Sequence, residues 1–459
     1  MKVSKLFEPV QVGDMILQHR VVLAPLTRFR ADDQHVSLLH VAEYYAQRAS
    51  LPGTLLISEA TFIAQRAGGY PNAPGIWSDA QIAAWKRITD AVHAKGSFMY
   101  LQLWALGRAA NPKQLASEGV NLPYVSASAL PLLEQNSATP RALTIAEIEE
   151  YVELYAAAAH NAVHRAGFDG VEVHGANGYL IDQFLQDVSN VRKDVYGGSV
   201  QNRARFALEV VDAVVKRVGA RKTAIRFSPW STNQGMGMRD PKPTFSYVVR
   251  ELRMRYPDLA YIHVIEPRVN GTTTLKSVPT GQSNDFIREI WCGGDSERRL
   301  ISAGGYTRAT GMAQADATGE LIAYGRPFIA NPDLPYRLAK NVPLAVGARK
   351  WYYRYGSTDP KGKWWLAMFI FFSKSYIDNW HFGKANVQVA ECACRAYGHT
   401  QLIALTEASL LNTSALDTAP TTNWVQAVPL AKEGCSTRHA SIPCTRYLSR
   451  YGIGQNDPS

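Results

Sequence analysis

Residues 168–180 read FDGVEVHGANGYL, in which a short apolar run, GVEVH, is followed at once by a turn rich in glycine and asparagine. Seven further β-rich runs occur along the chain, at 21–27, 54–62, 97–104, 223–228, 259–265, 299–303 and 321–325. These runs are almost continuously apolar and do not alternate with polar residues. That pattern is typical of strands that are buried on both faces of a parallel sheet.

The segments between these runs carry helix signals. Ser78 to Gln81 and Thr144 to Glu147 form capping boxes, and each precedes apolar residues at helical spacing. A third stripe ends at Gly219 and consists of Phe206, Val210, Val214 and Val218. Eight strands that alternate with helices predict a (β/α)8 TIM barrel. A doubly wound sheet is disfavoured because Gly235-Met-Gly237 lacks the third glycine of a dinucleotide fingerprint.

The composition limits the classes of protein that remain. The net charge is +10, but the 49 basic residues are spread along the chain and form no basic stripe, so nucleic-acid binding is not indicated. A modest positive field also suits phosphorylated cofactors. The N-terminus lacks the apolar core of a signal peptide, and the most apolar run, 364–372, is shorter than the roughly 20 residues of a membrane span. We therefore expect a soluble, cytoplasmic protein.

A barrel of this kind places its active site at the carboxyl ends of the strands. The candidate site residues are therefore those at the predicted strand ends: Thr27, Ala60, Gln102, Trp104, His174, Asn177, Tyr179, Arg226, Gly304, Gly305, Gly325 and Arg326. They contain no cluster of carboxylates and no set of metal ligands, so no metal site is expected.

Several of these residues suggest a chemistry. His174 and Asn177 can direct N–H donors at one oxygen, which polarises a carbonyl group, and Tyr179 can supply a proton. The two glycine turns with Arg326 are typical of a phosphate site, although glycines also form tight turns without any ligand. Arg226 lies in an apolar strand and requires an acceptor, which is either a distant carboxylate or an electron-rich ligand.

Longer motifs extend these observations in order along residues 5–362. They are 24–28 (APLTR), 43–48 (EYYAQR), 67–75 (AGGYPNAPG), 101–104 (LQLW), 168–180, 194–199 (DVYGGS), 202–206 (NRARF), 265–268 (IEPR), 303–306 (AGGY) and 324–334 (YGRPFIANPDL). In this combination the chain resembles the Old Yellow Enzyme family of FMN-dependent ene-reductases. It is most similar to the fungal and plant branch, which includes the 12-oxophytodienoate reductases.

The resemblance implies non-covalently bound FMN, with NADPH as the hydride donor. Thr27 would bind the flavin O4, Gln102 the pyrimidine edge and Arg226 the N1/O2 side. The flavin ring would be lined by Pro25 and Ala60, and the phosphate would be held by Gly304, Gly305, Gly325 and Arg326.

The resemblance also implies roles toward the substrate. His174 and Asn177 would bind the carbonyl oxygen of an α,β-unsaturated compound, and Tyr179 would protonate its α-carbon. The pocket would be shaped by Trp104 and Tyr70.

The resemblance ends near residue 362. Residues 350–362 still resemble the closing segment of the family, in which Tyr352 or Tyr353 is the candidate aromatic residue near the site. We expect a TIM-barrel domain over 1–362 and a divergent C-terminal extension over 363–459. A gene-model artefact is the favoured interpretation of this extension, over an appended or membrane-associating segment. Four of the five cysteines lie in it, but Cys392-Ala-Cys394 has a spacing unusual for zinc.

The resulting hypothesis is an FMN-dependent NADPH dehydrogenase that reduces the C=C bond of an enone or enal, in fungal secondary metabolism, as a monomer or homodimer. Two alternatives stay open. One is a flavin-binding protein whose turnover is impaired by the foreign C-terminus. The other is a flavin-dependent isomerase or aldehyde-pathway enzyme.

Overall fold

The computed structural model describes residues 3–119, 122–132, 138–271, 273–295, 297–349 and 352–353. Within them eight parallel strands pair in succession and the last pairs with the first, so the sheet closes into a barrel. In ring order the strands are β3 (Val21–Leu23), β4 (Leu55–Ile57), β6 (Phe98–Trp104), β9 (Gly170–Gly175), β10 (Thr223–Phe227), β11 (Tyr261–Ile265), β14 (Leu300–Ala303) and β15 (Leu321–Tyr324). The predicted (β/α)8 barrel is confirmed. The predicted boundary at residue 362 and the extension over 363–459 lie outside the described residues and stay predictions.

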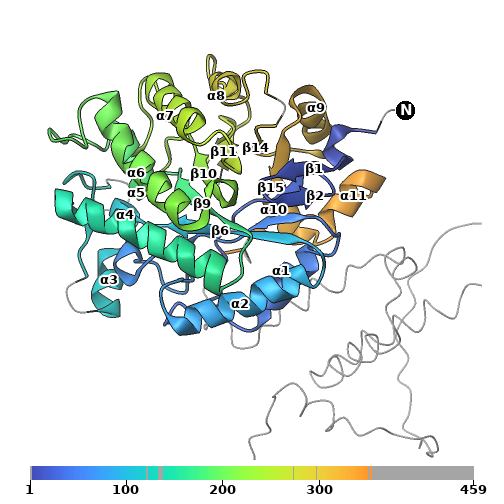
Figure 1. Cartoon of the computed structure of the whole chain (residues 1–459), viewed down its shortest axis with the longest axis horizontal. Coiled ribbons are helices and arrows are strands. Elements are labelled where there is room, and N and C mark those ends of the chain that lie inside the picture. The colour runs from blue at the N-terminus through green and yellow to red at the C-terminus, as the bar shows by residue number, and fades with distance from the viewer. Residues whose placement is uncertain are drawn as a thin grey trace, which may run out of the picture. The chain divides into compact units, whose positions relative to one another are not determined.

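Helices surround the strands (Figure 1). They are α1 (His40–Arg48), α2 (Asp79–His93), α3 (Pro112–Glu118), α4 (Ile145–His160), α5 (Leu180–Leu185), α6 (Val200–Val218), α7 (Lys242–Arg255), α8 (Asp285–Trp291), α9 (Arg308–Thr318), α10 (Arg326–Ala330) and α11 (Leu334–Lys340). Loops between them carry two short strand pairs, β7 (Val125–Ser126) with β8 (Arg141–Ala142) and β12 (Val269–Asn270) with β13 (Thr273–Thr274). Among the helices of the described residues, none is long and apolar enough to cross a membrane.

The helix signals in the sequence act as predicted. The Ser78 hydroxyl accepts the backbone N–H of Gln81 at 3.3 Å, and that glutamine side chain accepts the backbone N–H of Ser78 in return. Thr144 and Glu147 form the same reciprocal pair at the start of α4. Helix α6 ends at Gly219, where φ is +89°, a backbone conformation that favours glycine.

The first two strands are shorter than predicted. The run 21–27 ends its strand at Leu23, and the run 54–62 divides into β4 and β5 (Thr61–Phe62), which pairs with the end of β6. The division falls at Glu59, whose backbone N–H donates to the Tyr45 hydroxyl at 2.8 Å instead of to a neighbouring strand. A prediction from local hydrophobicity cannot indicate this hydrogen bond, because its acceptor lies in another segment of the chain.

An N-terminal hairpin fills the barrel at the amino ends of the strands. It consists of β1 (Val10–Val12) and β2 (Met15–Leu17), which pair antiparallel. Its buried side chains pack against inward-facing residues of the barrel strands, namely Val22, Leu55, Tyr100, Ala224, Tyr261, Ile301 and Leu321. The half of the barrel interior at the amino ends of the strands is therefore an apolar core, which we call the floor of the barrel.

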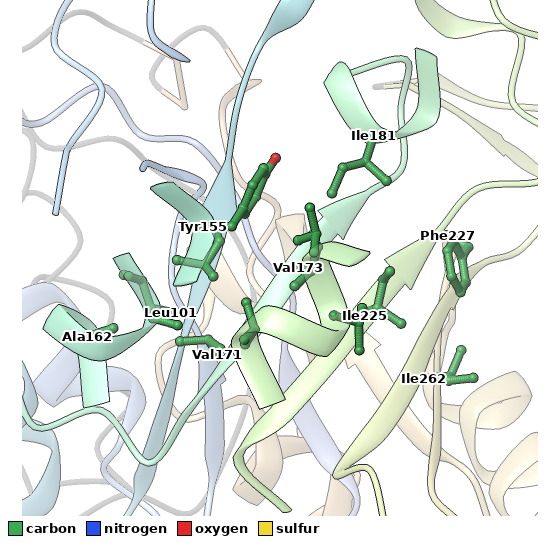
Figure 2. Packing of buried hydrophobic residues seen from close by; sticks show 14 of the residues in the cluster. Leu101, Tyr155, Ala162, Val171, Val173, Ile181, Ile225, Phe227 and Ile262 are labelled. Carbon is green, nitrogen blue, oxygen red and sulfur yellow. The ribbon is translucent and has the colours of Figure 1, made fainter. Parts of the chain in front are cut away.

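The strands alternate between two buried layers. Val171 and Val173 of β9 and Ile225 of β10 belong to the buried cluster between the strands and the helices, which also contains Tyr155 of α4 (Figure 2). Because side chains of a strand alternate between its faces, Glu172, His174 and Arg226 point to the barrel interior. These two strands are therefore apolar on the face toward the helices and carry polar side chains on the face toward the barrel interior.

Candidate active site

A layer of polar side chains lies next to the apolar floor of the barrel, toward the carboxyl ends of the strands. It consists of Gln102 from β6, Glu172 and His174 from β9, Arg226 from β10 and His263 from β11, all of which are buried. The strand register places Gln102 opposite Glu172, and it places Arg226 between His174 and His263. Sequence reasoning identified three of these residues but missed Glu172 and His263. Their signal is the polar residue within each apolar run, GVEVH and AYIHVI.

Glu172 is the acceptor at the centre of this layer. Its two carboxylate oxygens accept from Gln102 Nε2 at 2.7 Å and from His263 Nδ1 at 2.9 Å. Burial disfavours the carboxylate, but His263, Arg226 and Gln102 together outweigh that cost and hold the pKa of Glu172 below its ordinary value. Burial also lowers the pKa of His263. In this pair Glu172 is the hydrogen-bond acceptor and His263 Nδ1 is the donor.

Arg226 is a buried cation with spare hydrogen-bonding capacity. Burial lowers the pKa of its guanidinium, and the nearby charge of Glu172 acts in the opposite direction. Its Nε is buried and has no hydrogen-bond partner among the residues that the structure describes. The charge of Glu172 therefore acts on Arg226, and the buried Nε is left as a donor for a ligand.

The turn after β9 brings together His174, Asn177 and Tyr179. The Tyr179 ring lies edge-on to the rings of His174 and Trp104, with both pairs of centroids 4.9 Å apart. Asn177 has φ +60°, and its backbone N–H donates to the Ser228 hydroxyl at 2.7 Å. Asparagine adopts this left-handed conformation more readily than most residues.

The hydrogen donors of this turn are fixed by its environment. Burial, reinforced by the charge of Arg226, holds the pKa of His174 well below its usual range, so the imidazole is neutral. Its Nδ1 accepts the backbone N–H of Ala176 at 3.4 Å, which assigns the ring proton to Nε2. Burial raises the pKa of Tyr179 to about 12, so its phenol is protonated at neutral pH.

A network behind this turn fixes its backbone. Asp182 accepts the backbone N–H of Gly178 at 2.8 Å, and Gln183 Nε2 donates to the carbonyl oxygen of Gly178 at 2.8 Å. Gln234 donates to the carbonyl oxygen of Asn177 at 2.7 Å. The turn is therefore anchored from the helix after it and from the loop after β10.

Aromatic residues border the turn. The Trp104 ring stacks on Phe62 with centroids 4.9 Å apart and meets the edge of Tyr70 at 5.7 Å. Its indole Nε1 is buried and has no hydrogen-bond partner within the described part of the chain. The two aromatic residues expected to shape the pocket, Trp104 and Tyr70, thus lie beside each other, and Trp104 also lies beside Tyr179.

The loops after β3 and β4 meet next to this group. Pro25 and Ala60 are buried and Thr27 is half-buried. The two loops are joined where the backbone N–H of Arg28 donates to the Glu59 carboxylate at 3.0 Å. Arg28 Nε also donates to the carbonyl oxygen of Tyr352 at 3.0 Å, so this loop contacts one of the two candidate aromatic residues.

The glycine turns lie after β14 and β15. Gly304 and Gly305 have φ of +144° and +66°, and a Cβ added to Gly304 would lie 2.9 Å from the Cβ of Glu266. Arg268 Nε donates to the carbonyl oxygen of Gly304, and Arg326 Nη2 donates to the Thr274 hydroxyl at 2.8 Å. Arg268 was not selected from the sequence, although it belongs to the motif 265–268. The turns thus lie beside two guanidinium groups.

These groups occupy one edge of the barrel in two parts. The contacts above join the rings of His174, Tyr179, Trp104 and Tyr70 to one another. Separately, Gly304 contacts Arg268, and both Gly305 and Arg326 lie next to Thr274. Between them in the ring lie β10 and β11, which carry Arg226 and His263. The neutral imidazole of His174 and the phenol of Tyr179 thus lie on one side of the mouth. The glycine turns and the guanidinium groups of Arg268 and Arg326 lie on the other.

Comparison with known proteins identifies the family of the chain. Residues 5–345 match the model of the NADH:flavin oxidoreductase / NADH oxidase family. The chain is 52% identical over 364 residues to the chanoclavine-I aldehyde reductase fgaOx3 of Penicillium roqueforti, covering 78% of this chain and 95% of that protein. It is 46% identical over 361 residues to the probable inactive reductase easA of Epichloe festucae var. lolii, covering 77% and 93% of the two chains.

Solved structures give the same result for the fold. The crystal structure of Old Yellow Enzyme from Pichia sp. AKU4542 superposes with a TM-score of 0.69 at 40% sequence identity, covering 77% of this chain and 91% of that one. Together with the match over most of the barrel, this similarity shows that the chain belongs to the Old Yellow Enzyme family of FMN-dependent flavin oxidoreductases.

Proposed function

We propose that this chain is an NADPH-dependent ene-reductase that reduces the C=C bond of an α,β-unsaturated aldehyde or ketone. The observation that carries the proposal is the turn after β9, where a neutral imidazole with its proton on Nε2 and a protonated phenol lie 4.9 Å apart between ring centroids. Such a group can donate hydrogen bonds to a carbonyl oxygen and a proton to carbon without any charged residue.

The residues of the barrel mouth fit FMN. The buried Arg226 Nε has no partner among the described residues, and it suits the electron-rich pyrimidine side of a flavin. Gln102 uses one amide N–H toward Glu172 and keeps the other N–H and its carbonyl oxygen for a ligand. Pro25, Thr27 and Ala60 lie on the two joined loops next to them.

The glycine turns fit the phosphate end of the same cofactor. Gly304 and Gly305 permit a close approach of backbone N–H groups because neither carries a Cβ. Gly325 and Arg326 follow β15, and Arg326 retains donors beyond the one that binds Thr274. These four residues would hold the phosphate.

FMN held by these residues would supply the hydride chemistry, for which NADPH would be the donor and the β-carbon of the substrate the acceptor. His174 Nε2 and the amide of Asn177 would donate to the substrate carbonyl oxygen and so withdraw electrons from its C=C bond. Tyr179 would transfer its phenolic proton to the α-carbon. Trp104 and Tyr70 would exclude water and orient the substrate plane beside Tyr179.

The similarity to a chanoclavine-I aldehyde reductase of Penicillium roqueforti supports an aldehyde substrate. A role in fungal secondary metabolism is part of the same proposal. A second candidate is a flavin-binding protein with little turnover, because another relative of similar identity is named a probable inactive reductase. The presence of Tyr179 beside His174 favours the active enzyme.

The two candidates differ in one measurement on the purified full chain. The visible spectrum reports bound FMN, and anaerobic mixing first with NADPH and then with 2-cyclohexenone or cinnamaldehyde reports both half-reactions. We expect a yellow protein that NADPH bleaches and that the unsaturated carbonyl restores. A bleached protein that neither compound restores would favour the inert binder, and a colourless protein that takes up no FMN would refute both.

A further inference from the structure

The described structure contains a carboxylate in the barrel interior to which the proposed mechanism assigns no role. Glu172 is fully buried on the inner face of β9, two residues before His174. Below it lie the rings of Tyr100 and Tyr261, whose centroids are 5.4 Å apart and which belong to the apolar floor. Glu172 therefore lies at the boundary between the floor and the polar mouth.

Its contacts connect three strands. Gln102 Nε2 on β6 donates to one oxygen at 2.7 Å, and His263 Nδ1 on β11 donates to the other at 2.9 Å. His263 reaches Glu172 across β10, the strand that carries Arg226. The carboxylate thus fixes the orientation of the Gln102 amide through a hydrogen bond. It and the Arg226 guanidinium also affect each other electrostatically.

A buried carboxylate in this position is costly unless something requires it. Leaving water is unfavourable for the charge, and a neutral residue of similar shape would fill the same space at less cost. Here Arg226 is a cation in the same layer, so the negative charge of Glu172 is opposed by a positive group. A change in the charge of Glu172 would consequently act on whatever Arg226 contacts.

We propose that Glu172 is a positioning residue of the flavin site, which fixes the amide of Gln102 and, as the counter-charge of Arg226, sets the reduction potential of bound FMN. This inference rests on the proposed function, since it assumes that Gln102 and Arg226 bind the flavin. The Arg226 cation favours the reduced, more negative flavin, and the Glu172 carboxylate moderates that preference. Removal of the carboxylate charge should therefore make the flavin easier to reduce.

The test compares Glu172→Gln with the wild-type full chain. This substitution keeps the side-chain volume and removes the charge. We expect the preference for reduced over oxidised FMN, measured as a ratio of dissociation constants, to rise about tenfold, which is a potential about 30 mV more positive for a two-electron couple. Equilibrium reduction against a reference dye measures this potential directly.

Glu209→Gln is the matched control. Glu209 lies on the outer helix α6 and accepts from the Tyr196 hydroxyl at 2.9 Å, so its substitution changes the net charge equally but outside the barrel interior. We expect its potential to equal that of the wild type. Equal shifts in both variants, or a change of less than about twofold in the ratio for Glu172→Gln, would overturn the inference.

Glu172→Asp separates the reach of the side chain from its charge. It retains the charge but retracts the carboxylate from Gln102, so we expect FMN to bind about tenfold more weakly, as for the loss of a hydrogen bond to a charged group. Unchanged FMN affinity in this variant would overturn the positioning of Gln102 even if Glu172→Gln did not fold. Failure of the wild-type chain to bind FMN would instead refute the proposed function and this inference together.

Discussion

The hydroxyl of Tyr179 is the group that the proposed reaction depends on most directly, and Tyr179→Phe removes it with little other change. The ring would keep its edge-on contacts with Trp104 and His174, each 4.9 Å between centroids. Neither of these contacts uses the hydroxyl. The substitution therefore tests proton donation and leaves the shape of the site in place.

The expected magnitude follows from the role of the phenol. A positioned general acid contributes about 10²- to 10⁴-fold to a rate, which is about 3 to 5 kcal/mol of transition-state stabilisation. We expect reoxidation of the reduced enzyme by 2-cyclohexenone to slow by a factor in this range. Reduction by NADPH requires no proton from Tyr179 and should change by less than about twofold.

Anaerobic stopped-flow absorbance of the flavin separates the two half-reactions. Tyr256→Phe is the control, because that hydroxyl donates to Asp212 at 2.8 Å at the end of the outer helix α7 and is remote from the turn after β9 in the fold. Reoxidation of Tyr179→Phe within about threefold of the wild-type rate would refute the assignment of Tyr179 as proton donor.

Three further predictions concern pH and packing. Because burial raises the pKa of Tyr179 to about 12, the phenol stays protonated below that pH, and the rate of reoxidation by enone should be flat from about pH 6 to 10 and fall only above it; a fall centred near pH 8 would contradict this. Gly304→Ala would force a Cβ to within 2.9 Å of Glu266 at φ +144°, which should cost about 1 to 3 kcal/mol, lower Tm and weaken FMN binding; an unchanged Tm would show that the turn adjusts freely. Gln183→Leu removes four buried hydrogen bonds, to Arg108, Ser126, Leu106 and Gly178, and should reduce the free energy of unfolding in urea by about 3 kcal/mol or more; a loss below about 1 kcal/mol would count against its anchoring role.

Most of the fold follows from local patterns. The apolar runs and the capping residues Ser78 and Thr144 predict the strands and helices because burial on both strand faces and satisfaction of helix ends are properties of short segments. The hairpin at 10–17 was not predicted, although VQVGDMIL alternates in burial around a Gly13-Asp14 turn. Its role as the barrel floor depends on which strands surround it, and a local pattern holds no information about that.

The candidate site likewise has a part that the sequence predicted and a part that it did not. The types of residue at the strand ends, from Thr27 to Arg326, could be read from the chain because the carboxyl ends of barrel strands face one mouth. Gln102 and Arg226 were both predicted, but Glu172, which accepts from Gln102 and whose charge acts on Arg226, was not. A carboxylate within an apolar strand has no visible partner in the sequence, since its donors lie 70 and 91 residues away.

The sequence by itself therefore determined the barrel, its family resemblance and the chemical inventory of its mouth, because these depend on periodicity and on residue types at strand ends. Only the tertiary structure decided which of those groups are charged and which are neutral donors. The neutral imidazole of His174 and the ionised state of the fully buried Glu172 follow from burial and from charges on other strands. Burial also keeps the phenol of Tyr179 protonated to a higher pH than an exposed tyrosine. Protonation depends on desolvation and on nearby charges, and both arise only when distant segments pack together.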